Sequence, residues 1–139
     1  MKKTTAFILY FSAFVTIKLS PQQTFCLNNG IQNDMKSIVQ TNDGGYALGG
    51  SCETFTNLID FHVIKTDAVG NLLWARTAGG SSYDQCHSIT KSSDNGIVMC
   101  GYTNSFGAGL ADIYVVKFDS AGNLSWTRTV GGTDSDVGH

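Results

Sequence analysis

The strongest constraint on this chain is that one stretch of its sequence occurs twice. D-A-V-G-N-L-L-W-A-R-T-A-G-G, residues 67–80, returns as D-S-A-G-N-L-S-W-T-R-T-V-G-G, residues 119–132, and 119 − 67 gives an offset of 52 positions. Each copy reads as a turn that leads into a strand with one Trp and one Arg, and two glycines close it. The chain is therefore expected to fold as successive copies of one small unit.

A second pair of segments fixes the length of the unit. Residues 37–50 resemble residues 88–101 at an offset of 51, so a single residue is inserted between Phe106 and Asp112. Insertions are tolerated in loops, so this glycine-rich segment is predicted to be a loop. A period of about 50 residues with several strand-like runs favours propeller blades over helical solenoids.

The composition favours an all-β fold. Of 139 residues, 14% are charged, below the roughly 25% of an average globular domain, as expected of strands that are buried on both faces. Sixteen glycines and one proline supply turns, and no stretch after the first twenty residues has the apolar spacing of an amphipathic helix. The net charge is −2 and the nine basic residues are scattered, so a nucleic acid is not expected as a partner.

The N-terminus has the features of a secretory signal peptide. Met1-Lys2-Lys3 precedes an apolar run over residues 6–17. A membrane anchor is the alternative, but Lys18 ends the run short of the roughly 20 residues that a span needs. Residues 1–26 are predicted to be a cleaved signal peptide, with the mature chain secreted or at the cell surface and without a membrane span. Lipidation of Cys26 is a weaker alternative, because Q-T-F before it lacks small residues.

Each copy contains four runs that are typical of strands. They are expected at residues 37–41, 46–51, 60–67 and 73–78, and at residues 86–91, 97–102, 112–119 and 124–130. The turn between the first two strands of the second copy is expected to place Asn95 and Gly96 at positive φ. The continuous apolar run over residues 97–102 predicts a strand buried on both faces.

Four antiparallel strands in about 50 residues are typical of a propeller blade. We therefore predict two four-stranded antiparallel β-propeller-type blades at residues 27–80 and 81–132, and the start of a third, truncated blade at residues 133–139. In the fourth strand of each blade, a Trp and an Arg two residues apart share a face. Trp74 and Trp126 are predicted to hold equivalent, partly buried sites, with Arg76 and Arg128 as their covers.

These motifs resemble those of a known family. The pattern D-x-x-G-N-x-x-W-x-x-x-x-G-G, with S-I-x-x-[TS]-x-D-[GN]-G and T-N-S-F-G-A-G, is similar to the tandem β-propeller repeats of secreted and cell-surface proteins, mostly bacterial. The resemblance covers residues 37–139. It implies a non-enzymatic scaffold or an interaction surface for an unknown protein or glycan, with no catalytic residues and no cofactor. Family members carry many copies, so the chain is expected to be a fragment of a longer propeller.

A fragment of a propeller enzyme, glycosidase-like or quinoprotein-like, is the alternative function. T-N-D-G-G at residues 41–45 and S-S-D-N-G at residues 92–96 resemble the start of the Asp-box of sialidase-type propellers, but Leu48 and Met99 stand where an aromatic residue is expected. The D-x-x-G-N-x-x-W string also resembles the turn of quinoprotein propellers, in which tryptophans dock adjacent blades. Both motifs are predicted to be structural, and no catalytic, cofactor-binding or metal-binding residue is assigned.

Two groups of potential metal ligands are also predicted to have no metal. His87 and His139 occupy equivalent positions 52 residues apart and are expected to lie too far apart for one metal, while His62 lies in a third strand. Aspartates of the predicted turns, which could bind calcium weakly, lack the oxygen spacing of a dedicated calcium loop. They are Asp43, Asp67, Asp94 and Asp119.

Four cysteines in an exported chain would ordinarily suggest disulfides. A hairpin centred on residues 94–95 makes Cys86 face Thr103, which leaves Cys100 roughly 10 Å out of register, beyond the reach of a disulfide. Free thiols are therefore predicted at Cys52, Cys86 and Cys100.

Two blades are also too few to close a ring. The neighbouring blades that each blade requires are expected from a longer chain or from self-association. The isolated segment is therefore predicted to associate or to aggregate.

Overall fold

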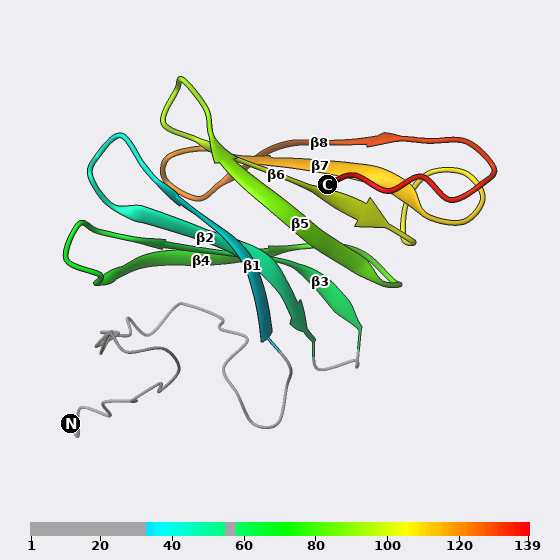
Figure 1. Ribbon diagram of the computed structural model, residues 1–139, viewed down its shortest axis with the longest axis horizontal. Helices are drawn as coiled ribbons and strands as arrows, with labels where there is room; N and C mark the ends of the chain where they lie inside the picture. Colours follow the sequence, from blue (N-terminus) through cyan, green and yellow to red (C-terminus); the bar gives the residue numbers. More distant parts are fainter. Residues whose placement is uncertain (1–32, 55–57) are drawn as a thin grey trace.

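The computed structural model describes residues 33–54 and 58–139 and shows two four-stranded antiparallel sheets (Figure 1). Sheet A comprises β1 (Asn33–Gln40), β2 (Tyr46–Glu53), β3 (Ile59–Thr66) and β4 (Leu72–Ala78). Sheet B comprises β5 (Asp84–Lys91), β6 (Ile97–Thr103), β7 (Asp112–Phe118) and β8 (Leu124–Val130). The all-β prediction is confirmed for this part of the chain, in which neither sheet is closed. The predicted signal peptide lies outside the described residues.

The strands follow one another in sequence order within each sheet. The last hairpins of the two sheets also share a register, since Lys65 pairs with Trp74 and Lys117 with Trp126. A β-bulge interrupts β1 between Met35 and Ser37 and β5 between Cys86 and Ser88. The predicted loop between Phe106 and Asp112 connects β6 to β7 without regular structure.

The turns between the first two strands of each sheet use one residue of positive φ. Gly44 has φ +82° and Asn95 has φ +64°. Asparagine is among the few side chains that tolerate this conformation, so the prediction for Asn95 is confirmed. The prediction for Gly96 is wrong. Gly96 instead lies against the Phe118 carbonyl, where a Cβ would collide, so close approach rather than φ requires a glycine there.

The sheets pack face to face, with β5 across β1 and β2 (Figure 1). At the centre, Phe61 of β3 meets Tyr114 of β7 edge to face with ring centroids 5.2 Å apart. The buried core contains residues of both sheets: Ala47, Phe61, Val63, Trp74, Cys86, Ile89, Ile97, Met99, Tyr114, Val116 and Phe118. Each sheet therefore depends on the other for its apolar interior.

The prediction that both faces of residues 97–102 are buried assumed a neighbouring blade on each side, and the structure fully buries only one face. Burial alternates along β6: Ile97 and Met99 are buried, while Val98, Cys100 and Tyr102 are only half-buried. The second set faces away from sheet A. The run is apolar throughout, but only one of its faces has a complete partner.

The cysteine prediction is partly wrong. Cys86 and Cys100 are free, as predicted, although Cys86 pairs with Gly101 rather than Thr103. Cys52 is disulfide-bonded. The prediction compared Cys52 only with residues of the two copies, so it assigned no disulfide to this residue. Burial raises the pKa of the Cys86 thiol to about 12, so this sulfur is an unreactive part of the core.

The C-terminal segment, residues 133–139, lies against sheet B. The amide of Asp136 donates to the carbonyl of Ala111 over 2.6 Å, and the amide of Gly138 donates to the carbonyl of Gly101 over 3.3 Å. The segment thus occupies part of the face that points away from sheet A, near the middle of β6.

Candidate functional site

The contact that joins the two sheets at one end is made by Trp74 and Arg76 of β4. The indole Nε1 of Trp74 donates to the carbonyl of Ser120 over 3.2 Å, and Nε of Arg76 donates to the carbonyl of Gly122 over 2.8 Å. Both acceptors lie in the β7–β8 turn. Gly122 rests on the indole so closely that a Cβ would lie 2.7 Å from the ring. We call this pair of side chains the β4 clamp.

Trp126 and Arg128 of β8 form a second pair, which we call the β8 clamp. The guanidinium carbon lies 5.9 Å from the ring centroid in the β4 clamp and 6.0 Å in the β8 clamp. In each, the arginine also donates to the preceding carbonyl, Ala75 or Thr127. Trp74 is 6% exposed but Trp126 is 38% exposed, so the predicted equivalence of register is confirmed and that of burial is wrong.

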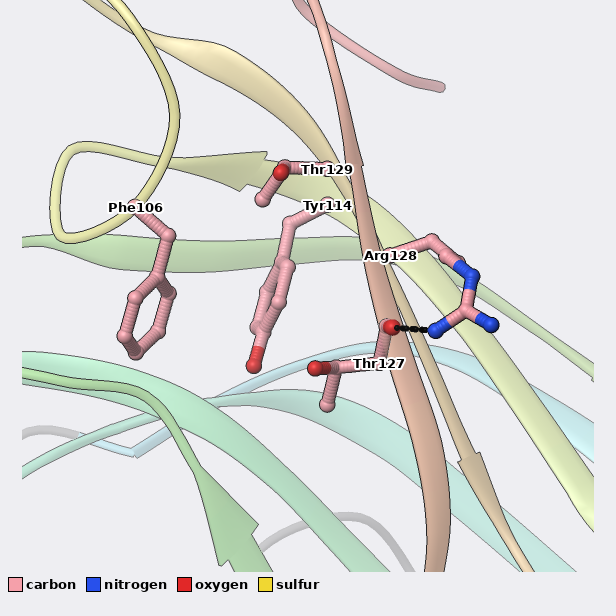
Figure 2. A pocket seen from close by; sticks show the side chains of 5 residues that line it. All are labelled: Phe106, Tyr114, Thr127, Arg128 and Thr129. Carbon is pink, nitrogen blue, oxygen red and sulfur yellow. Dashed lines mark hydrogen bonds between the residues drawn. The ribbon is translucent and has the colours of Figure 1, made fainter.

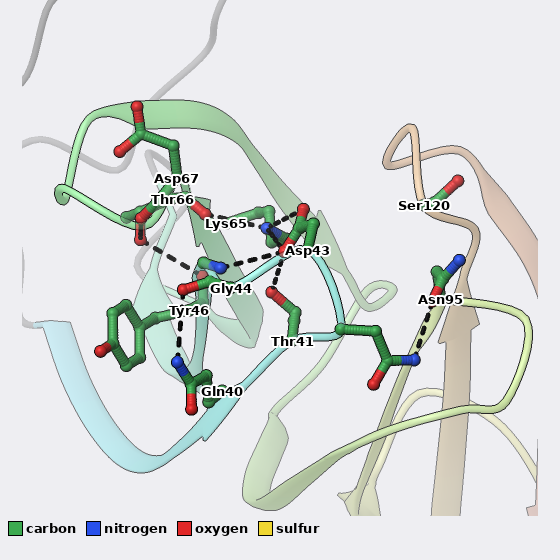
Figure 3. A network of polar contacts seen from close by, with 12 residues as sticks. Gln40, Thr41, Asp43, Gly44, Tyr46, Lys65, Thr66, Asp67, Asn95 and Ser120 are labelled. Carbon is green, nitrogen blue, oxygen red and sulfur yellow. Dashed lines mark hydrogen bonds and ion pairs between the residues drawn. The ribbon is translucent and has the colours of Figure 1, made fainter.

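Asp43 organises the β1–β2 turn (Figure 3). It accepts hydrogen bonds from Thr41 Oγ1 and the Gly45 amide, and it forms an ion pair with Lys65 Nζ at 2.8 Å. The hydrogen bond from Lys65 is the main cause that holds the pKa of Asp43 well below its usual range. The carboxylate is bound by donors of its own turn and of β3, as the structural interpretation of the Asp-box-like motif predicts.

Asp94 does the same in the β5–β6 turn. It accepts from Ser92 Oγ and the Gly96 amide and pairs with Lys117 Nζ, and the Lys117 hydrogen bond is the main cause that lowers its pKa. The two turns also meet, because Asn42 Nδ2 donates to Asn95 Oδ1 over 2.8 Å (Figure 3). Together with Ser120, they line a pocket of about 240 Å³ between the sheets.

Asp67 and Asp119 cap the turns that precede β4 and β8. Asp67 accepts from the amides of Val69 and Asn71 and from the Asn71 side chain. The Asn71 side chain is the main cause that lowers the Asp67 pKa. Asp119 and Asn123 repeat this arrangement, with the same effect on the Asp119 pKa. The four turn aspartates are thus all engaged by donors of their own hairpins.

A second pocket, of about 340 Å³, lies between β8 and the β6–β7 loop. Figure 2 shows the rings of Phe106 and Tyr114 side by side, with Thr127 and Thr129 facing them from β8. Arg128 reaches away from the rings on the other side of β8. The ring centroids of Phe106 and Tyr114 are 5.5 Å apart. Tyr114 is buried and supports the ring of Phe106, which is 44% exposed. One exposed aromatic ring beside hydroxyl groups suits a ligand that is both apolar and hydrogen-bonding.

A pair of carboxyl groups, Asp60 and Asp84, was not singled out from the sequence. Both lie so close to Gly79 that a side chain there would collide with them. Asp84 is buried and accepts from Thr103, Ser105 and the Gly80 amide. One buried oxygen of Asp60 has no partner. Partial burial and, secondly, the Asp84 charge raise the Asp60 pKa to about 6.

The same arrangement recurs near Gly131. Asp112 and Asp136 crowd Gly131 as Asp60 and Asp84 crowd Gly79, and Asp136 accepts from the Gly132 amide over 2.9 Å. The two pairs are separated by the repeat offset of 52 residues, and this offset is the sequence feature from which the pairs could have been predicted. Because Asp84 is saturated with donors, this geometry suits the anchoring of a loop.

The histidines lie in different surroundings. His62 is buried, its Nδ1 has no hydrogen-bond partner, and burial lowers its pKa to about 4. His87 and His139 stack with ring centroids 5.1 Å apart, so the expectation that they lie far apart is wrong. Among residues 33–54 and 58–139, no group of three or more His, Cys, Asp or Glu side chains is placed to hold a metal.

A scan of protein-family models and a search of curated proteins found no match to this chain. Within the described part of the chain, no helix has the length and apolarity required to cross a membrane.

Proposed function

We propose that this chain is a non-enzymatic β-propeller-type module of a secreted or cell-surface protein, part of a longer propeller, which acts as a scaffold or as an interaction surface. The observation that carries the proposal is the β4 clamp. Trp74 and Arg76, which are identical in the two copies of the repeat, hold the turn of the next sheet in place. Sheets that are completed by their neighbours are typical of blades arranged around a ring.

The polar residues of the shared motifs support a structural role. Each turn aspartate is bound by donors of its own hairpin or by a lysine of the same sheet. Such side chains fix loops, and the loops of a rigid β scaffold are where binding surfaces are commonly built.

Export is supported by the disulfide bond of Cys52. Disulfides persist in oxidising compartments and are rare in the cytosol. The basic start and the apolar run of the N-terminus agree with this assignment.

For the interaction surface, we favour the pocket lined by Phe106, Tyr114 and the β8 threonines. Phe106 is 44% exposed, so its ring is open to a ligand. Aromatic rings stack on the apolar faces of sugars and of side chains, while hydroxyl groups orient them. The ligand class is therefore a glycan or an exposed protein segment.

The test measures binding and turnover in one experiment. The chain is titrated with a panel of neutral and sialylated oligosaccharides, and the products are analysed for hydrolysis. Binding that is weakened at least about tenfold by Phe106→Ala, without hydrolysis, is the expected result. Leu110→Ala is the matched control, because Leu110 is exposed in the same loop but does not line the pocket.

The alternative, a fragment of a glycosidase-like or quinoprotein-like propeller enzyme, predicts another outcome. Partial burial raises the pKa of the Asp60 carboxyl group to about 6, and a raised pKa suits a general acid. Hydrolysis of any oligosaccharide that Asp60→Asn abolishes would overturn the non-enzymatic proposal.

A further inference from the structure

The β4 clamp shows what such a pair of side chains recognises. Its contacts with the β7–β8 turn are the carbonyls of Ser120 and Gly122 and the Cα of Gly122 under the indole. Gly122 adopts φ +82°. The side chain of Ala121 remains exposed in the docked turn. The clamp thus recognises a turn that has a glycine at positive φ and free carbonyl groups on that glycine and on the residue two positions before it. It does not depend on the side chain of the residue directly before the glycine.

The β8 clamp has the same shape, and no turn of residues 33–54 or 58–139 occupies it. Its cation–π distance matches that of the β4 clamp, and the arginine of each is held by the preceding carbonyl over 2.7 or 2.8 Å. Around it, Val98 and Val115 of the same face are half-buried. Their counterparts beside the β4 clamp, Ala47 and Val63, are fully buried by sheet B.

A turn that fits this clamp is exposed on sheet A. The β3–β4 turn, residues 67–71, closes with an Asp67 N to Asn71 O bond of 2.9 Å, as the docked turn does between Asp119 and Asn123. Gly70 has φ +84° and no atom within 4 Å of a Cβ built on it. Val69, the counterpart of Ala121, is 83% exposed.

We propose that the β8 clamp binds the β3–β4 turn of a second copy of this chain, so that copies associate head to tail. The indole of Trp126 packs on Gly70 of the second copy, and Trp126 and Arg128 donate to the carbonyls of its Ala68 and Gly70. Between copies, this contact has the same form as the contact of the β4 clamp with Gly122, which joins the two sheets within one copy. The contact is heterologous, so a dimer keeps one free clamp on one copy and one free turn on the other, and further copies can add to form rings or chains.

The contact is confined to the clamp end of sheet B. At the middle of β6, Gly138 and His139 already lie against Gly101 and His87. The association is therefore expected to be weak and concentration-dependent. It does not require export or a bound ligand, so its failure would leave the proposed function untouched.

Two variants remove opposite halves of the contact. Trp126→Ala removes the indole of the clamp, which packs against no neighbouring sheet. Gly70→Asn keeps a residue that tolerates positive φ, as Asn95 does in this chain, and places its side chain in open space in the free copy. In the contact, that Cβ would collide with the indole, as one at Gly122 would collide with Trp74.

Sedimentation velocity over a concentration series decides the proposal. Wild type is expected to associate, and each variant alone is expected to remain monomeric. An equimolar mixture of the two variants is expected to form a 1:1 dimer, because the intact clamp of Gly70→Asn can hold the intact turn of Trp126→Ala.

Gly44→Asn is the matched control. It makes the same substitution at φ +82° with only an ordinary contact nearby, so it should associate like wild type. A wild-type chain that stays monomeric up to about 1 mM would overturn the proposal. So would a mixture of the two variants that stays monomeric, or variants that associate as wild type does. Circular dichroism spectra matching wild type establish that both variants fold.

Discussion

His62 is the residue that best shows how burial without a partner affects stability. Its imidazole is buried on β3, and no donor or acceptor meets Nδ1. The neutral ring is favoured in the folded state, where the pKa is about 4, whereas the ordinary value is 6.5. Between these values the unfolded chain binds a proton that the folded chain does not, so stability falls as the pH falls through this range.

We therefore expect the free energy of unfolding to decrease by about 2 to 3 kcal/mol between pH 7 and pH 4.5 because of His62. His62→Gln, which cannot be protonated, should remove most of this decrease. Urea titrations of both proteins at several pH values measure the difference. Parallel pH profiles for the two proteins would mean that the ring is solvated.

The thiols give a second prediction for single residues. Since Cys52 is in a disulfide while Cys86 and Cys100 are free, the unfolded, unreduced protein should show two reactive thiols. In the folded protein, the buried Cys86 should react far more slowly than the half-buried Cys100. Titration with a thiol reagent, with and without denaturant, tests both the number of thiols and their relative rates. Three reactive thiols in the unfolded, unreduced protein would contradict the expected number of two.

At the scale of the elements, β4 and β8 carry the same motif in different surroundings. Trp74 touches Phe118, Ser120 and Gly122 of sheet B. In the described part of the chain, neither sheet covers Trp126 as sheet B covers Trp74, and Trp126 is 38% exposed. Trp74→Ala should therefore reduce the free energy of unfolding by about 3 to 5 kcal/mol, and Trp126→Ala by less than about 1 kcal/mol. Denaturant titration compares them directly, and equal losses would contradict the assigned role of the β4 clamp.

The strands were predictable because their signals are local. Turn residues such as Asp43 and Asp119 mark where the hairpins begin, and β8 was predicted at its observed bounds. The bulge at Cys86 was not predictable, since it depends on the close approach of Gly101 to the Gln85 carbonyl. The bulge shifts the register of the hairpin by one position, and the turn lies one position away from the predicted pairing, so Cys86 pairs two positions away from its predicted partner.

For the whole molecule, the sequence predicted two similar units but not how they meet. Burial differs between equivalent positions, such as Trp74 and Trp126, because it depends on which neighbour is present. The pairing of Asp60 with Asp84 was also missed. These residues belong to different sheets and come together only when the chain crosses from β4 to β5 past Gly79. The periodicity of the sequence predicts the repeated unit, but the contacts between the units become visible only in the structure.

The central claim is that sheet A holds sheet B through the β4 clamp on Gly122. The most direct test compares Gly122→Asn with Gly70→Asn in their free energies of unfolding under conditions where both are monomeric. The two glycines have φ +82° and +84° in turns of the same hydrogen bonding, but only a side chain at Gly122 meets an indole. We expect Gly122→Asn to lose about 1 to 3 kcal/mol through overpacking and Gly70→Asn to lose less than about 1 kcal/mol. Equal losses in the two variants would show that the turn is not held by Trp74 and would contradict the account.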